Sequence, residues 1–354
     1  ADGEKLYNHK DMGLVAQVFS EDAIANLKGH IAVGHNRYST SAGSKLIHAQ
    51  PLLINGDTIA LAHNGNLPST AVLQEFLRGR GNDVSDVSDS RLVAEAIAVY
   101  MKDGMDVEEA VRKTFPMITG AFCILLLVKD KLIAIKDQCG IRPLCIGQLN
   151  GGWIICSETC ALQTIGAKFV REVNPGEMIV VDERGMRSEQ LATPIPKLDI
   201  FEFVYFARHD SDLLGQSVYK VRERFGERLA KERKIEADVV IPVPETAVPV
   251  AIGYARASGI PFEMGLAKNR YIHRTFIQPE QHLREQGVRM KLTPIESIIK
   301  GKRVVIVDDS IVRGTTSRQI VKMLFETGAK EVHFLVSSPP IKYPDFYGID
   351  TAKQ

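Results

Sequence analysis

The sequence predicts two domains of different fold class: an α+β domain with largely antiparallel sheets, then an α/β domain with a parallel sheet. Short strand-like runs separated by turns dominate the first half, and such runs are typical of hairpins. From Ser217 onward, strand-like and helical runs alternate, which predicts parallel strands joined by helices. The join is the proline-containing stretch LATPIPKLD, so we expect domains over residues 1–196 and 197–354.

Each element follows from its hydrophobic period, taken in chain order. In the first half we expect strands within residues 32–39, 58–66, 121–137, 144–156 and 177–186, and helices at residues 71–79 and 88–101. In the second half we expect helices at residues 217–232, 247–259 and 315–328, and strands at residues 237–243, 262–268, 303–308 and 331–338. The mixed charges of residues 220–236 favour a solvated helix face over a nucleic-acid patch, because acids and bases are interleaved.

The composition fits two domains with hydrophobic cores. The chain has 354 residues, of which 45% are hydrophobic and 25% charged, and its formal net charge is +1. This charge gives no indication of a nucleic-acid or membrane partner. No apolar run approaches the roughly 18 residues of a spanning helix, and no leader pattern opens the chain. We therefore expect a soluble cytoplasmic enzyme.

The five cysteines lie between residues 123 and 160. Several stand in apolar, strand-like runs such as AFCILLLV and WIICSETC. The spacing of Cys156 and Cys160 also fits half of a metal site, but no second Cys or His pair stands nearby. We favour buried thiols, since cysteine outside disulfides most often behaves as a small hydrophobic residue.

The most informative stretch is VVIVDDSIVRGTTS, residues 304–317. Asp308 and Asp309 end an apolar strand at the position where open parallel sheets bind ligands. Two such charges about 4 Å apart repel by roughly 4 kcal/mol at an effective dielectric near 20. The pair therefore indicates hydroxyl donors or a cation such as Mg²⁺ between the two acids. The alternative is an ordinary strand that ends in a helix cap.

The same stretch continues into a helix expected to begin near Thr315. Backbone N–H groups at a helix start bind phosphate, and the hydroxyls of Ser310, Thr315 and Thr316 are expected beside them. The Gly-Lys-Ser/Thr ending of a nucleotide triphosphate loop is missing. A sugar phosphate fits better, with the acids on ribose hydroxyls and the helix start on the 5′-phosphate.

These residues resemble the signature of the type I phosphoribosyltransferases. The full sequence of the stretch is similar to that of the glutamine phosphoribosylpyrophosphate amidotransferases. Further matching stretches are FEFVYFARHDS (201–211), KNRYIHRTFIQP (268–279), REQGVRMKL (284–292) and FYGID (346–350). The resemblance covers nearly the whole chain. It implies an N-terminal nucleophile glutaminase domain followed by a type I phosphoribosyltransferase domain. It also implies that ammonia from glutamine displaces pyrophosphate from phosphoribosylpyrophosphate (PRPP), which gives 5-phosphoribosylamine for purine synthesis.

In the second domain, the resemblance implies the residues that bind PRPP. Mg²⁺ is expected on Thr246, Asp308 and Asp309. The stretch PVPETAVP (242–249) is similar to the pyrophosphate loop of the family, although alone it also fits a plain strand-to-helix turn. Cations for the phosphates are expected from the long basic segment between the two motifs. The full implied set is Glu245, Thr246, Lys268, Arg270, Arg289, Lys291, Asp308, Asp309, Ser310, Arg313, Gly314, Thr315 and Thr316.

In the first domain, the resemblance implies a glutamine site. Asn64 and Gly65 would form an oxyanion hole for the tetrahedral intermediate of amide hydrolysis, although alone they predict a hairpin turn. Arg37 would hold the carboxylate of glutamine, and Asp89 its amino group. Without the resemblance, a surface salt bridge fits Arg37 and a helix N-cap fits Asp89.

The chain departs from the family pattern in two places. Family members begin with a catalytic Cys and then a His-Arg-Gly stretch, whereas this chain opens ADGEKLYNHKDMG and ends soon after FYGID, so we expect a fragment without the nucleophile. Many members hold an iron–sulfur cluster with four cysteines, and Asp199 and Asp345 stand at two of those positions. Because such clusters use thiolates, we expect no cluster.

The resemblance further implies purine nucleotides as inhibitors and a homo-oligomer, a tetramer in the family. Two other classes of function stay open: a PRPP-binding regulator, and a salvage phosphoribosyltransferase that joins a free base to the sugar. No helix-turn-helix pattern supports a DNA-binding regulator. The glutaminase half argues against both alternatives.

Overall fold

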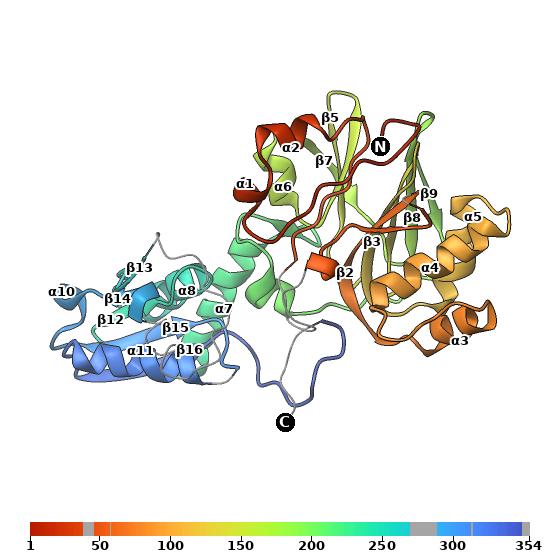
Figure 1. Cartoon of the computed structure of the whole chain (residues 1–354). Coiled ribbons are helices and arrows are strands. Elements are labelled where there is room, and N and C mark those ends of the chain that lie inside the picture. Colours follow the sequence, from red (N-terminus) through yellow and green to blue (C-terminus); the bar gives the residue numbers. More distant parts are fainter. Residues whose placement is uncertain (38–45, 57, 270–288, 313, 349–354) are drawn as a thin grey trace. The chain divides into compact units, whose positions relative to one another are not determined.

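The computed structural model describes residues 1–37, 46–56, 58–269, 289–312 and 314–348. The chain forms two compact units, whose elements are labelled in Figure 1. Unit 1 contains Ala1–Ser157, Ala161–Asp199 and the stretch that starts at Pro344, and unit 2 contains Glu158–Cys160 and Ile200–Tyr343. In the described ranges, every helix is too short or too polar to cross a membrane.

Unit 1 is built on a six-stranded antiparallel sheet with the order β1-β2-β3-β4-β8-β9 and a three-stranded antiparallel sheet with the order β6-β5-β7. The antiparallel sheets predicted for the first half are confirmed. The strands are β1 (Leu52–Ile54), β2 (Ile59–Ser69), β3 (Thr119–Leu127), β4 (Leu132–Lys136), β5 (Cys145–Leu149), β6 (Gly152–Cys156), β7 (Lys168–Glu172), β8 (Glu177–Asp182) and β9 (Gly185–Gln190). The helices of this part of the chain are α1 (Val15–Val18), α2 (Glu21–Ala25), α3 (Ala71–Gly79), α4 (Asp89–Lys102), α5 (Val107–Thr114) and α6 (Thr159–Thr164).

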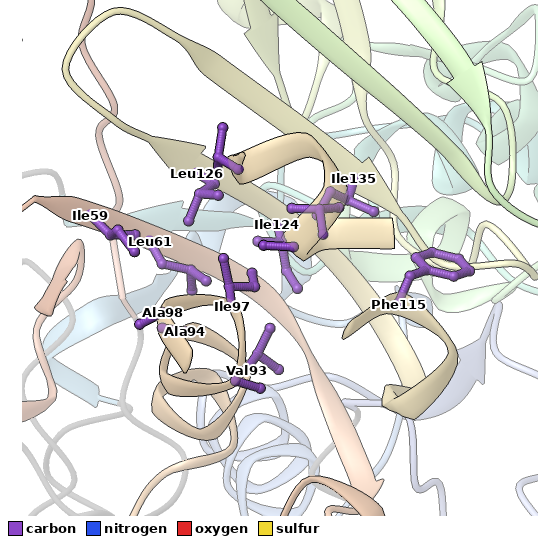
Figure 2. Close-up of a cluster of buried hydrophobic side chains, with 14 of the residues drawn as sticks. Ile59, Leu61, Val93, Ala94, Ile97, Ala98, Phe115, Ile124, Leu126 and Ile135 are labelled. Carbon is purple, nitrogen blue, oxygen red and sulfur yellow. The ribbon is translucent and has the colours of Figure 1, made fainter. Parts of the chain in front are cut away.

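The large sheet has two buried faces, because successive side chains of a strand point to opposite sides. Ile124 and Leu126 of β3 belong to a core that includes residues of α4, whereas Cys123 belongs to a second core with residues of β5 and β6. Figure 2 shows the first core, in which Ile97 of α4 lies beside Ile124. The strand β2 therefore lies in a sheet that is fixed from both sides.

Unit 2 contains a three-stranded parallel sheet with the order β12-β15-β16, as the βαβ pattern predicts. Val304 and Ile306 of β15 pack in one core with α11, and Val305 and Val307 pack in another core with α8, so helices cover both faces. The elements are a π-helix (Glu202–Phe206), β10 (Asp212–Leu213), β11 (Gln216–Ser217), α7 (Val218–Glu232), β12 (Val239–Pro242), α8 (Val248–Ser258), β13 (Leu266–Lys268), β14 (Leu292–Pro294), α10 (Glu296–Ile299), β15 (Arg303–Asp308), α11 (Thr315–Glu326) and β16 (Glu331–Val336).

Three local predictions were wrong. Residues 32–37 form no strand, and the carbonyl of Ala1 accepts the N–H groups of His30 and Ile31 just before them. The hairpin alternative for Asn64-Gly65 fails because β3 pairs with β2 through both residues. Residues 262–268 do not extend the parallel sheet beyond one isolated bridge at Phe262, because β13 pairs with β14 instead.

Candidate active sites

Three connections of unit 2 leave the same edge of the parallel sheet. Pro242 at the end of β12 pairs with Val307 of β15, and Asp308 pairs with Val336 at the end of β16. Carboxyl ends of parallel strands meet at one edge, which is where open sheets bind ligands. The loop after β12 and the acidic loop that follows Asp308 therefore start side by side.

Hydrogen bonds to neighbouring backbone and hydroxyl groups hold the two acids. The N–H of Ser337 donates to the carbonyl of Asp308 at 3.1 Å, and the N–H of Ser338 donates to the carbonyl of Asp309 at 2.8 Å. The carboxylate of Asp309 accepts from the Ser310 hydroxyl at 2.7 Å. The end of β16 thus fixes the backbone from which both acids project.

The charge of this loop is only partly balanced by the protein. Burial and the negative charge of Asp309 raise the pKa of Asp308 to about 7. A bound cation would reverse that shift, because it favours the ionised form of both carboxyls. Among the described residues, no three or more His, Cys, Asp or Glu side chains are grouped so that they could hold a metal ion by themselves. Mg²⁺ needs only one or two carboxylates beside waters and substrate phosphates, so this donor set fits it.

The helix α11 begins directly after the acidic loop. Its N-cap is Gly314 with φ 69°, and among the described residues no side chain caps this start. Thr315 and Thr316 are exposed there. Uncapped N–H groups at a helix start favour an anion such as phosphate. Arg313, which the sequence also assigns to this loop, lies outside the described residues.

The predicted pyrophosphate loop leads from β12 into α8. Glu245 is exposed at its tip, Thr246 is half-buried, and the Pro244–Glu245 peptide bond is cis. The Nζ atom of Lys268, at the end of β13, lies 3.5 Å from the carboxylate of Glu245. The structure therefore brings one of the predicted phosphate cations to this loop.

The other cations predicted from the basic segment are Arg289, Lys291 and Arg270. Arg289 forms an ion pair with Glu326, the last residue of α11, which is about 16 Å along the helix from Thr315 at 1.5 Å per residue. The carbonyl of Lys291 accepts from the N–H of Asn269 at 2.9 Å, one residue beyond β13. Arg270 lies outside the described residues.

In unit 1, Asn64 and Gly65 lie in the middle of β2. Asn64 is exposed and Gly65 half-buried, and they pair with Cys123 and Phe122 of β3. A Cβ atom at Gly65 would lie 1.9 Å from the carbonyl oxygen of Ala121, so only glycine fits here. The thiol of Cys123 is buried and donates to the Arg142 carbonyl at 3.4 Å, an environment typical of an unreactive cysteine.

Asp89 is connected to β2 through two residues that the sequence reasoning missed, His63 and Ser90. The Oδ1 atom of Asp89 accepts from the N–H of Ser90 at 2.7 Å. The Nδ1 atom of His63 lies 3.0 Å from the Ser90 hydroxyl and 3.8 Å from Oδ2 of Asp89. Burial lowers the pKa of His63, and the charge of Asp89 opposes that shift. The sequence offered one signal for these two residues, because each is the chain neighbour of a predicted site residue: His63 precedes Asn64, and Ser90 follows Asp89.

The structure excludes the N-cap alternative for Asp89 and locates Arg37. The N-cap of α4 is Ser88, whose side chain accepts from the N–H of Arg91, so the N-cap alternative for Asp89 was wrong. The guanidinium of Arg37 donates to the carbonyl of His48 at 3.1 Å. Burial lowers the pKa of His35, while a hydrogen bond to the His63 backbone raises it. His35 therefore lies next to β2.

The two acids at the cluster positions of the family are in unit 1. Asp199 is half-buried, and its Oδ2 atom lies 3.8 Å from Nη1 of Arg142. Asp345 accepts from the N–H of Tyr347 at 2.7 Å, and Arg142 donates to the carbonyl of Tyr347 at 3.3 Å. A guanidinium paired with a carboxylate does not fit a cluster that thiolates bind.

Comparisons with known proteins agree with this geometry. Residues 35–164 match the family described as "Glutamine amidotransferase domain", and residues 214–341 match "Phosphoribosyl transferase domain". The amidophosphoribosyltransferase of Mycobacterium tuberculosis is 46% identical over 99% of this chain and 68% of its own length. That of Bacillus subtilis is 46% identical over 99% of this chain and 74% of its own length.

Solved structures show the same similarity. The B. subtilis glutamine PRPP amidotransferase complexed with ADP and GMP superposes with a TM-score of 0.90 at 45% identity, over 99% of this chain and 77% of that one. A structure described as the allosteric regulatory enzyme of purine biosynthesis gives a TM-score of 0.91 at 46% identity, over 99% and 76%. With both domain families present in this order and identity sustained along the chain, it belongs to the amidophosphoribosyltransferase family.

Proposed function

We propose that this protein makes 5-phosphoribosylamine for purine biosynthesis, by displacing pyrophosphate from PRPP with ammonia taken from glutamine. The observation that carries the proposal is the shared edge of the parallel sheet, where the loop after β12 starts beside the acidic loop after β15. We assign residues 1–196 to a glutamine amidotransferase domain and residues 197–354 to a phosphoribosyltransferase domain.

In the transferase domain, the acids and the helix start have separate roles. Asp308 and Asp309 accept hydrogen bonds from the ribose hydroxyls. The 5′-phosphate binds at the start of α11, where the dipole and the N–H groups favour an anion. The pyrophosphate binds beside Lys268 at the loop after β12. The complete assignment is Glu245, Thr246, Lys268, Asp308, Asp309, Ser310, Gly314, Thr315 and Thr316, with Arg270, Arg289, Lys291 and Arg313 as further candidates.

Thr246, Asp308 and Asp309 would hold Mg²⁺. When bound, this ion neutralises charge on the pyrophosphate leaving group. The raised pKa of Asp308 supports the assignment, since it reflects the burial of this carboxyl and the negative charge of Asp309 beside it, both of which a bound cation would offset. We propose no iron–sulfur cluster, because Asp199 and Asp345 provide carboxylates where thiolates would be needed.

In the glutaminase domain, the Asn64 side chain and the Gly65 N–H would donate to the oxyanion of the tetrahedral intermediate. Arg37 would bind the glutamine carboxylate and Asp89 its amino group. The contacts of His63 and Ser90 with Asp89 support this assignment, because they tie that carboxylate to the strand of the oxyanion hole. We assign the nucleophile to none of the five cysteines.

We also propose purine nucleotides as inhibitors, a homotetramer and a cytoplasmic location. The B. subtilis relative complexed with ADP and GMP supports the first of these. The glutamine amidotransferase match argues against the two alternatives, a PRPP-binding regulator and a purine-salvage phosphoribosyltransferase.

Pyrophosphate release at saturating PRPP and Mg²⁺ tests the proposed reaction. We expect release with ammonium chloride and none with adenine or guanine. Release with a purine base would indicate the salvage reaction. Binding of PRPP without turnover on any nitrogen donor would indicate a regulator.

A further inference from the structure

Two thiols of unit 1 lie against each other outside the residues assigned to glutamine and PRPP. Cys145 begins β5 and Cys156 ends β6, and the two residues pair directly across this antiparallel hairpin. Their Sγ atoms lie 3.5 Å apart. Both cysteines are free thiols in this structure. Two free thiols in contact are a candidate for a reversible disulfide, and the surrounding backbone decides whether that bond fits.

The pairing of β5 with β6 satisfies the geometry of a disulfide. A disulfide needs Cα atoms about 4.4–6.8 Å apart, and directly opposed residues of antiparallel strands have Cα atoms about 4.5–5.5 Å apart. The register runs without a shift from Cys145–Cys156 at the open end of the hairpin to Leu149–Gly152 beside its turn. The sulfurs would have to approach from 3.5 Å to about 2.0 Å, which rotation of the two side chains supplies while the strands stay paired.

The two thiols differ in how easily a reagent reaches them. Successive side chains of a strand alternate, so Cys145 shares a face of β5 with Gly147, whereas Ile146 packs on the other face in the core shared with the large sheet. A Cβ atom at Gly147 would lie 2.5 Å from Cδ2 of Leu162, so α6 covers the face with the thiols. Cys145 is only 2% exposed, while Cys156 is half-buried. A small oxidant therefore meets Cys156 first.

This difference in exposure sets the order of a thiol–disulfide exchange. The Cys156 thiolate attacks a small disulfide such as glutathione disulfide, and one glutathione thiolate leaves while the other half stays bound to Cys156. The Cys145 thiolate then attacks the Cys156 sulfur and releases the second glutathione thiolate. Two protein thiols are oxidised to one disulfide, glutathione disulfide is reduced to two glutathione molecules, and the protons of the protein thiols end on the released thiols.

We propose that Cys145 and Cys156 are a redox-sensitive pair, which a low-molecular-weight disulfide oxidises to a cross-strand bond that closes the open end of the β5–β6 hairpin. Reducing conditions reopen the bond, as is usual for disulfides of cytosolic proteins. The bond should stabilise the native protein, since a cross-link restricts the unfolded chain. The alternative is that two cysteines pack here only as small hydrophobic residues, which predicts no closure.

The first experiment maps the bond in the folded full chain. The protein is incubated with glutathione disulfide, and the remaining thiols are then alkylated with N-ethylmaleimide in urea. Chymotrypsin, which cleaves after Trp153, and Glu-C, which cleaves after Glu158, separate Cys145, Cys156 and Cys160. We expect Cys145 linked to Cys156 in a product about 2 Da lighter than its reduced parts, and dithiothreitol should separate the two peptides. Absence of this product, or a bond to another cysteine, would overturn the inference.

Variants test the order of the exchange. Cys145→Ala should keep glutathione on Cys156, because the thiol that releases it is missing. In Cys156→Ala, Cys145 should stay free, because it is buried. The matched control is Cys139→Ala, which removes another half-buried thiol and should close like the wild type. Glutathione on Cys145 in Cys156→Ala would contradict the order, and wild-type mapping tests the bond itself even if a variant does not fold.

Urea unfolding tests whether the bond belongs to the native fold. The oxidised wild type should unfold at a higher urea concentration than the reduced protein, and dithiothreitol should remove the difference. Cys145→Ala treated in the same way should show no such shift. Closure without a higher midpoint would show that the bond forms only when the native strand pairing is disturbed, and this would refute a role in the folded protein.

Discussion

The backbone N–H of Asp309 donates a hydrogen bond to the carboxylate of Asp308 at 2.9 Å. This bond makes the two neighbouring acids one unit at the end of β15. The bond lowers the pKa of Asp308, but burial and the negative charge of Asp309 have the larger effect and raise that pKa to about 7. The pair therefore favours a proton, a cation or hydroxyl donors, and the predictions for the transferase domain follow from this property.

Asp308→Asn and Asp309→Asn should each lower ammonium-dependent kcat/KM for PRPP by about 100-fold or more, while the fold is kept. Each variant removes a charged acceptor aimed at the ribose or at Mg²⁺, and such interactions contribute several kcal/mol in a closed site. Steady-state pyrophosphate release over a range of Mg²⁺ concentrations measures the effect. Unchanged turnover with unchanged Mg²⁺ dependence would restore the helix-cap interpretation.

Without Mg²⁺ and PRPP, the free energy of unfolding should fall as pH rises between the ordinary Asp value of 3.8 and about 7. In that window the folded protein binds more protons at Asp308 than the unfolded chain does, so stability decreases with pH. The total change is at most about 4 kcal/mol, and less because the carboxyl is partly exposed. Urea unfolding of wild type and Asp308→Asn at several pH values tests this; equal slopes would contradict it.

Gly226→Ala should destabilise unit 2 by about 3 kcal/mol or more. A Cβ atom at Gly226 of α7 would lie 1.9 Å from the carbonyl oxygen of Val250 in α8, so the two helices would have to separate. Gly79→Ala is the matched control, because nothing lies within 4 Å of its Cβ position. Urea unfolding should show a large loss for the first variant and none for the second. Similar stabilities of the two variants would mean that the helices adapt.

A polypeptide limited to residues 1–354 should release pyrophosphate with ammonium but not with glutamine. Cys123 pairs with Asn64, yet its thiol is buried and bonded to the Arg142 carbonyl, so it is a poor nucleophile. The two nitrogen donors are compared at saturating PRPP and Mg²⁺. Turnover with glutamine would locate a nucleophile among the five cysteines, and Cys123→Ser would then be the first variant to assay.

Protein purified without oxygen should contain no stoichiometric iron or sulfide. Asp199 is paired with Arg142, and a carboxylate in that ion pair is not the soft ligand that iron–sulfur clusters require. Metal analysis and the visible spectrum test the expectation. Broad absorbance with matching iron and sulfide would refute it.

Local sequence determined the features that a short stretch can encode. The run Val304–Val307 is apolar on both faces of β15, the acids follow where the strand ends, and Thr315 starts the next helix. Strand, acidic turn and helix start are consecutive in the chain, so the phosphate site of a parallel sheet could be predicted before any packing was known. The antiparallel sheets of unit 1 followed in the same way from their hairpins.

Tertiary structure decided the features that depend on a partner far away in the chain. Asn64-Gly65 has the local signal of a turn, but pairing with Cys123 and Phe122 keeps it inside β2. The charged pattern around Arg222 predicts a solvated face, yet the carbonyl of Phe203 receives its guanidinium in the interior. The hydrophobic period of a segment indicates which of its faces is buried, but the groups on that face find their partners only when a distant segment packs against it.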